Sequence, residues 1–185
     1  MFIFPIIFTF LISHASANDS PFYEEIPPTS VGLQKEKFSH FHFYFHILNS
    51  GPKPTVVEVA RASITNTSAS FFGRVEIADD PLTVGPELES KLVGKAQGMY
   101  GFADQEETGL VMIFNFVFTV GKFNGSTLTM VGRNLVFSPD VREMPIVGGS
   151  GVFRFARGYA QVKTYAFNAT SGNSVLDYNL YVFHY

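Results

Sequence analysis

VREMPIVGGSGVFRFARGYA, residues 141–160, holds the clearest structural signal in the sequence. A charged pair, Arg142 and Glu143, and a proline precede glycines at positions 148, 149 and 151. Glycines allow positive φ and close backbone approach, so we expect a glycine-rich turn followed by a strand. Alternation divides that strand into one face of Ala156, Gly158, Ala160 and Val162 and another of Phe153, Phe155, Arg157 and Tyr159. The first face is thin and leaves room for a ligand.

The same alternation recurs along the chain and predicts an all-β fold. Residues 38–49 form a strand with an apolar face of Phe41, Phe43, Phe45 and Ile47. Further strands are expected at residues 55–60, 72–78, 93–102, 108–118, 126–131, 152–167 and 175–184, separated by turn signals such as Asp79-Asp80-Pro81. Eight strands with short connections predict a closed eight-stranded antiparallel β-barrel, because closure hides the edges of so apolar a sheet.

Length and composition fit one such domain. The chain has 185 residues, of which 46% are hydrophobic and 21 are phenylalanine, enough for one packed core. Residues 18–37 carry three prolines and no sustained period, which predicts a flexible N-terminal arm before a barrel at residues 38–185. The formal net charge of -3 removes the electrostatic reason to expect nucleic acid or an anionic membrane as a partner.

The N-terminus and the sequons predict a secreted protein. Residues 1–17 read as a signal peptide, an apolar run that ends in Ala15-Ser16-Ala17, and no later segment is long and apolar enough to span a membrane. Glycosylation is expected at Asn66, Asn124 and Asn168, which begin N-x-S/T sequons in turn-like settings. Because the chain has no cysteine, its stability must come from the core and from contacts between subunits.

Most of the chain resembles the plant dirigent proteins. The opening stretch is similar to a long, ungapped block of that family, and so are LQKEKFSHFHFYFH (residues 33–46), ADDPLTVGPELESKLVGKAQGMY (78–100) and YNLYVFHY (178–185). The resemblance is strongest to a cysteine-free subgroup that also contains pterocarpan-synthase-like members. It implies a barrel of the allene oxide cyclase type, assembled as a trimer or dimer and located in the extracellular space, the apoplast or cell wall.

Two residues are expected to bind a phenolic ligand. Gly94, Ala96 and Gly98 share a strand face with Tyr100, which predicts a hollow with a phenol at its end. On the residues alone, a core tyrosine bonded to backbone is the favoured interpretation of Tyr100, and Arg142 is also compatible with a surface pair to Glu143 or Asp140. The resemblance assigns both to the family's pocket, Tyr100 as the last residue of AQGMY and Arg142 as the arginine of VRE.

The acidic positions of the family differ here. The resemblance places an aspartate directly after YFH, where this chain has Ile47, and a second where it has Asn134. A carboxylic acid in an apolar barrel could protonate a leaving group, whereas isoleucine cannot and asparagine only hydrogen-bonds. Further substrate contacts are expected from Phe43, Phe45, Asp79 and Asp80, the two aspartates lying near the barrel mouth by resemblance and otherwise typical of a structural turn.

Three histidines on one strand, His40, His42 and His46, have a spacing that could bind a metal. Their face should be the outer or subunit-facing one, and no acid is expected to join them, so we predict packing or hydrogen bonding. No metal and no other cofactor are expected.

The sequence leaves three functions open. The first is a dirigent protein that orients phenoxy radicals, such as those of coniferyl alcohol, which a separate laccase or peroxidase generates, so that their coupling gives optically active lignans. The second is a pterocarpan-synthase-like dehydratase that acts on a hydroxyisoflavan through a quinone methide, a reaction that Ile47 disfavours. The third is a non-catalytic binding protein of the cell wall.

Overall fold

A computed structural model describes residues 26–33 and 35–185 of the chain. The predicted signal peptide and residues 18–25 of the predicted arm lie outside the described residues. The described strands are β1 (Lys37–Ile47), β2 (Val56–Arg61), β3 (Arg74–Thr83), β4 (Leu92–Phe102), β5 (Gly109–Phe118), β6 (Thr127–Leu135), β7 (Arg142–Ser150), β8 (Arg157–Phe167) and β9 (Ser174–His184). The short 3-10 helices are η1 (Pro28–Val31), η2 (Ser63–Thr67), η3 (Gly121–Phe123) and η4 (Gly151–Phe153).

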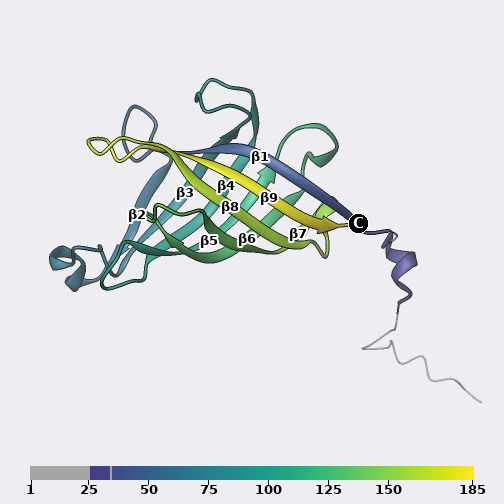
Figure 1. The fold of residues 1–185 in the computed structure, drawn as a ribbon, viewed down its shortest axis with the longest axis horizontal. Helices are drawn as coiled ribbons and strands as arrows, with labels where there is room; N and C mark the ends of the chain where they lie inside the picture. Colours follow the sequence, from purple (N-terminus) through teal and green to yellow (C-terminus); the bar gives the residue numbers. More distant parts are fainter. Residues whose placement is uncertain (1–25, 34) are drawn as a thin grey trace, which may run out of the picture.

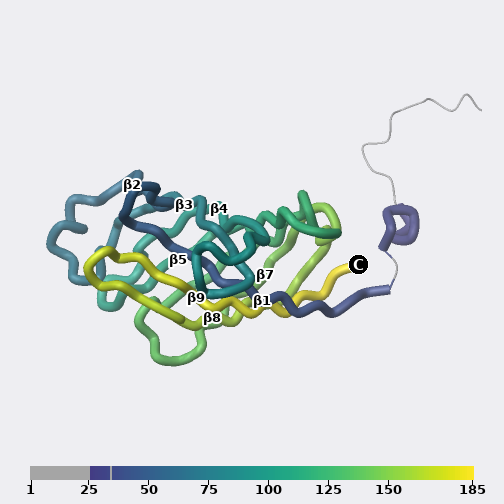
Figure 2. The backbone as a smooth tube through the Cα atoms, turned by 90° about the horizontal axis from the view of Figure 1, so that it is seen from above, coloured from purple at the N-terminus to yellow at the C-terminus, as the bar shows by residue number. Residues whose placement is uncertain are grey.

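The strands form one antiparallel sheet that closes into a barrel (Figure 1). Each strand from β3 to β9 pairs with the next, and β9 pairs with β1 from Lys37↔His184 to Ile47↔Ser174. β1, β9 and β8 therefore run side by side in both views (Figures 1 and 2). The ring is completed where Tyr44 and Phe45 of β1 pair with Thr83 and Leu82 of β3. This arrangement confirms the predicted eight-stranded antiparallel barrel.

The set of eight strands differs from the predicted one. β2 pairs only with β3. It occupies the part of the β3 edge that does not pair with β1, so β2 lies beside the closed ring. The missing member is β7, which occupies residues that we expected to form a glycine-rich turn. The predicted strand at residues 152–167 is correspondingly wrong in its first part, because η4 takes residues 151–153 and β8 begins only at Arg157.

The glycines of the opening stretch have two roles: one allows β7 to approach β6 closely, and another forms the turn after β7. A Cβ on Gly149 would lie 2.4 Å from the carbonyl oxygen of Thr127 on β6, so this position of β7 needs glycine. The turn itself falls at Gly151, where φ is +63°. Phe153 then points inward and is fully buried, contrary to the predicted face, while Phe155 is exposed.

Strand β3 points two acidic side chains inward and the apolar Ile77 outward. It continues through the residues expected to form the Asp79-Asp80-Pro81 turn, which is therefore wrong. Glu76 and Asp80 face the interior and are buried, whereas Ile77 is 42% exposed on the outside. This inversion brings two carboxyl groups into the barrel.

Aromatic rings fill one end of the barrel and leave the other end open. Phe41, Phe118, Phe123 and Phe153 pack together beneath η3 and η4, with ring centroids 5.2 to 6.2 Å apart. In the middle, Phe43 stacks on Tyr178 at 5.8 Å. The predicted inward face of β1 is thus confirmed for its phenylalanines. In the part of the chain that the structure covers, no helix is long and apolar enough to cross a membrane.

Candidate functional site

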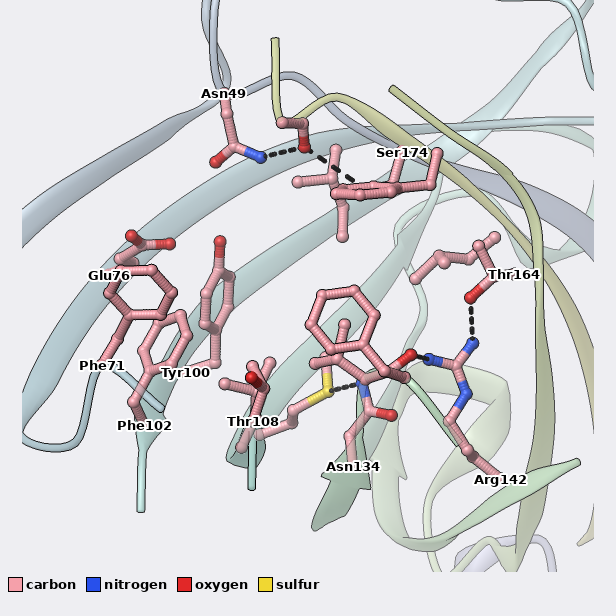
Figure 3. Close-up of a pocket in the computed structure, with 18 of the residues that line it drawn as sticks. Asn49, Phe71, Glu76, Tyr100, Phe102, Thr108, Asn134, Arg142, Thr164 and Ser174 are labelled. Atoms are coloured by element: carbon pink, nitrogen blue, oxygen red, sulfur yellow. Dashed lines mark hydrogen bonds between the residues drawn. The ribbon is translucent and has the colours of Figure 1, made fainter. Parts of the chain in front are cut away.

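A cavity of about 610 Å³ opens at the end of the barrel opposite the aromatic cluster (Figure 3). Its volume is in the range that small organic ligands occupy in proteins. Most of its wall is apolar, and polar groups lie at separate places on it. The lining residues that matter below are Phe45, Ile47, Arg74, Glu76, Tyr100, Phe102, Asn134, Arg142 and Thr164.

Tyr100 stands on one wall, on the inward face of β4, and is 6% exposed. Its ring stacks on Phe114 at a centroid distance of 6.2 Å and lies beside Phe102 at 6.1 Å. Burial raises the pKa of the Tyr100 hydroxyl above its ordinary value, and the neighbouring Glu76 carboxylate raises it further. The group is therefore a neutral phenol that can donate a hydrogen bond into the cavity.

The hollow that we expected beside Tyr100 has a different origin. Cβ atoms on Gly94 and Gly98 would meet the backbone carbonyls of Val117 and Ile113 on β5 at 2.3 Å and 2.1 Å. These glycines let β4 and β5 approach closely, and neither lines the cavity. The open space begins at Tyr100 and extends toward the mouth.

Arg142 stands on another wall, at the start of β7 (Figure 3). It is 6% exposed, and its Nη1 and Nη2 donate to the carbonyl oxygen of Val136 at 3.0 Å and to Oγ1 of Thr164 at 2.9 Å. The buried Nε has no hydrogen-bond partner, and no described carboxylate forms an ion pair with this guanidinium. Burial lowers the pKa of Arg142 below its ordinary value. A buried cation without a counter-charge favours a ligand that brings negative charge.

The positions expected to hold an acid line the same cavity without providing one. Ile47 contributes an apolar side chain from the end of β1. Asn134 is buried, its Nδ2 donates to the sulfur of Met112 at 3.1 Å, and its Oδ1 has no partner among the described residues. Phe45 also lines the cavity, whereas Phe43 lies deeper in the core and does not reach it.

The structure separates the two aspartates. Asp79 lies on the outside, where its carboxylate accepts bonds from Lys95 at 2.6 Å and Gln97 at 2.9 Å, so the expected position at the mouth is wrong. Asp80 is fully buried inside the barrel and accepts a bond from Oγ1 of Thr55, but it does not line the cavity. Burial raises the pKa of Asp80 to about 7.

Glu76 and Arg74 are cavity residues that the sequence analysis missed. Glu76 is the cross-strand partner of Tyr100, and Nε of Arg74 lies 3.0 Å from its Oε1. The sequence instead predicts that Glu76 faces solvent, because its neighbours Val75 and Ile77 are apolar and should occupy the inner face.

The histidines form no metal site. His40 bonds to Asn179 at 2.8 Å, and the buried His46 bonds to Thr83 at 2.7 Å. His42 lies 2.9 Å from Asp177, which corrects the expectation that no acid joins this face. Within residues 26–33 and 35–185, no group of three or more histidine, aspartate or glutamate side chains could hold a metal ion.

The three sequon asparagines, Asn66, Asn124 and Asn168, are exposed. Asn66 lies in η2, Asn124 directly follows η3, and Asn168 directly follows β8. Their glycosylation stays a prediction.

Fold and cavity together define a class of protein, an eight-stranded antiparallel barrel that is open at one end and encloses a cavity between a phenol and a buried arginine. A family model described as Dirigent-like protein matches residues 38–183. The chain belongs to the dirigent family.

Individual relatives extend this result. Pterocarpan synthase 1 of Glycyrrhiza echinata is 53% identical over 164 residues, which cover 89% of this chain and 87% of that protein. Dirigent protein 21 of Arabidopsis thaliana is 50% identical over 184 residues, which cover 100% of this chain and 97% of that protein. The solved structure of the pterocarpan synthase dirigent protein GePTS1 is 54% identical, with a TM-score of 0.77 over 82% of this chain and 87% of that one.

Proposed function

We propose that this protein is a dehydratase of the pterocarpan synthase kind, which converts a hydroxyisoflavan into a cyclised product through a quinone methide. The observation that carries the proposal is the buried Arg142, which has no carboxylate partner among the described residues and lines the same cavity as the neutral phenol of Tyr100. The 53% identity to a pterocarpan synthase supports it.

The two polar walls suit the charge changes of this reaction. A substrate phenol held by Arg142 ionises more readily, and its phenolate can push out the hydroxyl group on the conjugated benzylic carbon. The carbon–oxygen bond breaks as Tyr100 gives its proton to the departing hydroxide, which leaves as water. A second phenol of the same molecule then adds to the benzylic carbon of the quinone methide, and its O–H proton leaves to restore Tyr100. The first oxygen becomes a phenolate again at Arg142, and it takes back from water the proton that it gave up on ionising.

The apolar wall explains how such a site gives one stereoisomer. Phe45, Ile47 and Phe102 offer no hydrogen bonds, so they constrain the substrate by shape alone. A difference of about 1.4 kcal/mol between two competing transition states gives a tenfold ratio of products. The barrel thus needs only a modest preference for one orientation of the substrate.

The test is direct. Purified protein is incubated with a racemic hydroxyisoflavan that carries a free 2′-phenol, and the products are separated by chiral chromatography. We expect consumption of part of the racemate and one enantiomer of the cyclised product. Unreacted substrate at all protein concentrations would refute the proposal.

One observation favours a second candidate, the stereoselective coupling of phenoxy radicals. Ile47 and Asn134 line the cavity at the two positions where the resemblance expects acids, and coupling requires orientation of two radicals without an acid at either position. The oxidation would come from an external laccase or peroxidase. Coniferyl alcohol with laccase, with and without the protein, tests it, since only a coupling protein gives optically active lignans. Racemic lignans together with an unreacted isoflavan would leave the non-catalytic binding protein.

We place either activity outside the cell, in a secreted and glycosylated oligomer. This setting rests on the apolar N-terminal run and on the three exposed sequon asparagines. Secretion of a tagged full-length chain, with a mass that falls after deglycosylation, is the result expected.

A further inference from the structure

Glu76 is the one carboxylic acid among the described residues that line the cavity. It projects inward from β3 and is 6% exposed. Glutamate is rarely buried to this extent unless it is paired or has a function. Its neighbours therefore decide what this side chain can do.

A built arrangement holds the carboxyl group against Tyr100. Glu76 and Tyr100 are direct cross-strand partners on the inner face of β3 and β4, which brings their side chains into contact range. On the other side, Nε of Arg74 lies 3.0 Å from Oε1 of Glu76. The Arg74 guanidinium is itself held between two aromatic rings, 4.7 Å from the centroid of Phe71 and 4.1 Å from that of Phe102. In Figure 3, Glu76, Tyr100, Phe71 and Phe102 gather on one side of the cavity, away from Arg142.

These contacts divide the roles of the two groups. Nε of Arg74 faces the carboxyl group of Glu76, and a carboxylate accepts a proton or a hydrogen bond. Tyr100, whose pKa is raised by burial and by the Glu76 carboxylate, is a neutral phenol that can donate a proton or a hydrogen bond. A proton acceptor and a proton donor thus stand side by side at the same place in the cavity.

We propose that Glu76 is a catalytic base, which takes the proton of the attacking phenol during ring closure and returns it to Tyr100. This inference rests on the proposed dehydratase function and adds a residue to its site. The departing hydroxyl and the attacking phenol oxygen occupy the same benzylic carbon in turn, so both must lie near this one pair of side chains.

The proton count closes over one turnover. Tyr100 loses its proton to the hydroxide, which gives water and a tyrosinate. The phenol oxygen then forms its bond to the benzylic carbon, its O–H bond breaks, and the proton passes to the Glu76 carboxylate. The protonated Glu76 transfers that proton to the tyrosinate, and both side chains are restored.

The experiment separates ring closure from loss of water. Glu76→Gln keeps the size of the side chain and removes its basicity, and Glu143→Gln makes the same change at an exposed position of β7. Both variants and the unmodified protein are incubated with the hydroxyisoflavan in water enriched in oxygen-18. Mass spectrometry measures the cyclised product and the oxygen-18 that enters the recovered substrate when water adds back to the quinone methide.

We expect Glu76→Gln to form cyclised product about 100-fold more slowly or worse, the usual contribution of a positioned base, while oxygen-18 still enters the substrate. Glu143→Gln should match the unmodified protein in both readouts. Glu76→Asp, which keeps a carboxylate, should recover part of the cyclisation, and thermal unfolding checks that each variant is folded.

Other results overturn the inference in distinguishable ways. If cyclisation and oxygen-18 uptake fall together in a folded Glu76→Gln variant, Glu76 has a structural role and is no base. A Glu76→Gln variant as active as the unmodified protein excludes any role for this residue, yet leaves the dehydratase intact. A lack of product from the unmodified protein refutes the proposed function, and this inference with it.

Discussion

Replacing Asp80 by asparagine should stabilise the protein at neutral and alkaline pH. Asp80 is fully buried, its Oδ1 accepts a bond from Thr55, and its Oδ2 has no partner among the described residues. Burial raises its pKa from the ordinary 3.8 to about 7, so the folded protein favours the neutral acid. Asparagine is uncharged at every pH, and its Oδ1 can keep the bond from Thr55.

The magnitude follows from the two pKa values. Between pH 3.8 and about 7 the unfolded chain has lost the Asp80 proton while the folded chain retains it. The free energy of unfolding therefore falls as the pH rises through this window and levels off above it. A difference of about three pH units corresponds to about 4 kcal/mol. Asp80→Asn lacks this loss, so it should match the unmodified protein at pH 4 and exceed its stability by up to about 4 kcal/mol at pH 8.

Urea unfolding at a series of pH values, at one fixed protein concentration, measures this difference. Other groups also change the free energy of unfolding of each protein with pH. Burial lowers the pKa of His46, for example, so this residue reduces the stability of the protein as the pH falls below 6.5. Such contributions cancel when the variant is compared with the unmodified protein. Asp140→Asn, at an exposed position, is the matched control and should show no difference at any pH. An Asp80→Asn difference that is independent of pH, or that destabilises at pH 8, would show that Asp80 is held ionised.

Three further predictions concern the cavity and the core. Arg142→Met should lower kcat/KM for cyclisation by about 10-fold to 100-fold, because a hydrogen bond to a charged ligand oxygen is lost, and steady-state kinetics measures this. Tyr178→Phe should raise the free energy of unfolding by about 1 kcal/mol, because the buried Tyr178 hydroxyl has no described partner, and urea titration checks it. Gly98→Ala should destabilise the barrel by about 2 kcal/mol or more, because its Cβ would lie 2.1 Å from the Ile113 carbonyl oxygen, and a thermal midpoint equal to that of the unmodified protein would contradict the geometry.

Strict alternation is what made the barrel predictable from the sequence. In β1 and β4 the apolar residues fall at every second position, and both strands bury the predicted face. β7 escaped prediction because Pro145 and two glycines resemble a turn, although Arg142, Met144 and Ile146 alternate inward. Its proline lies opposite Tyr159 within the sheet, and only the pairing with β8 and β6 reveals it as a strand.

The candidate site was predictable where a side chain suits its environment. Tyr100 and Arg142 were assigned to the pocket by the family resemblance, and the structure places both in one cavity. Glu76 could not be found, because a charged residue between Val75 and Ile77 is expected to face water. Its inward position depends on Arg74 and Tyr100, which are partners that only the folded sheet supplies.

The pairing of the first strand with the last determines when this barrel can form during synthesis. The bond between His40 and Asn179 joins residues 139 positions apart, and β1 meets β3 at only two residue pairs. A ribosome that has made β1 must therefore complete β9 before β1 gains its main partner. Until then the ring of strands stays open, and we expect slow closure of the barrel, because its main closing contact joins segments that are far apart in sequence.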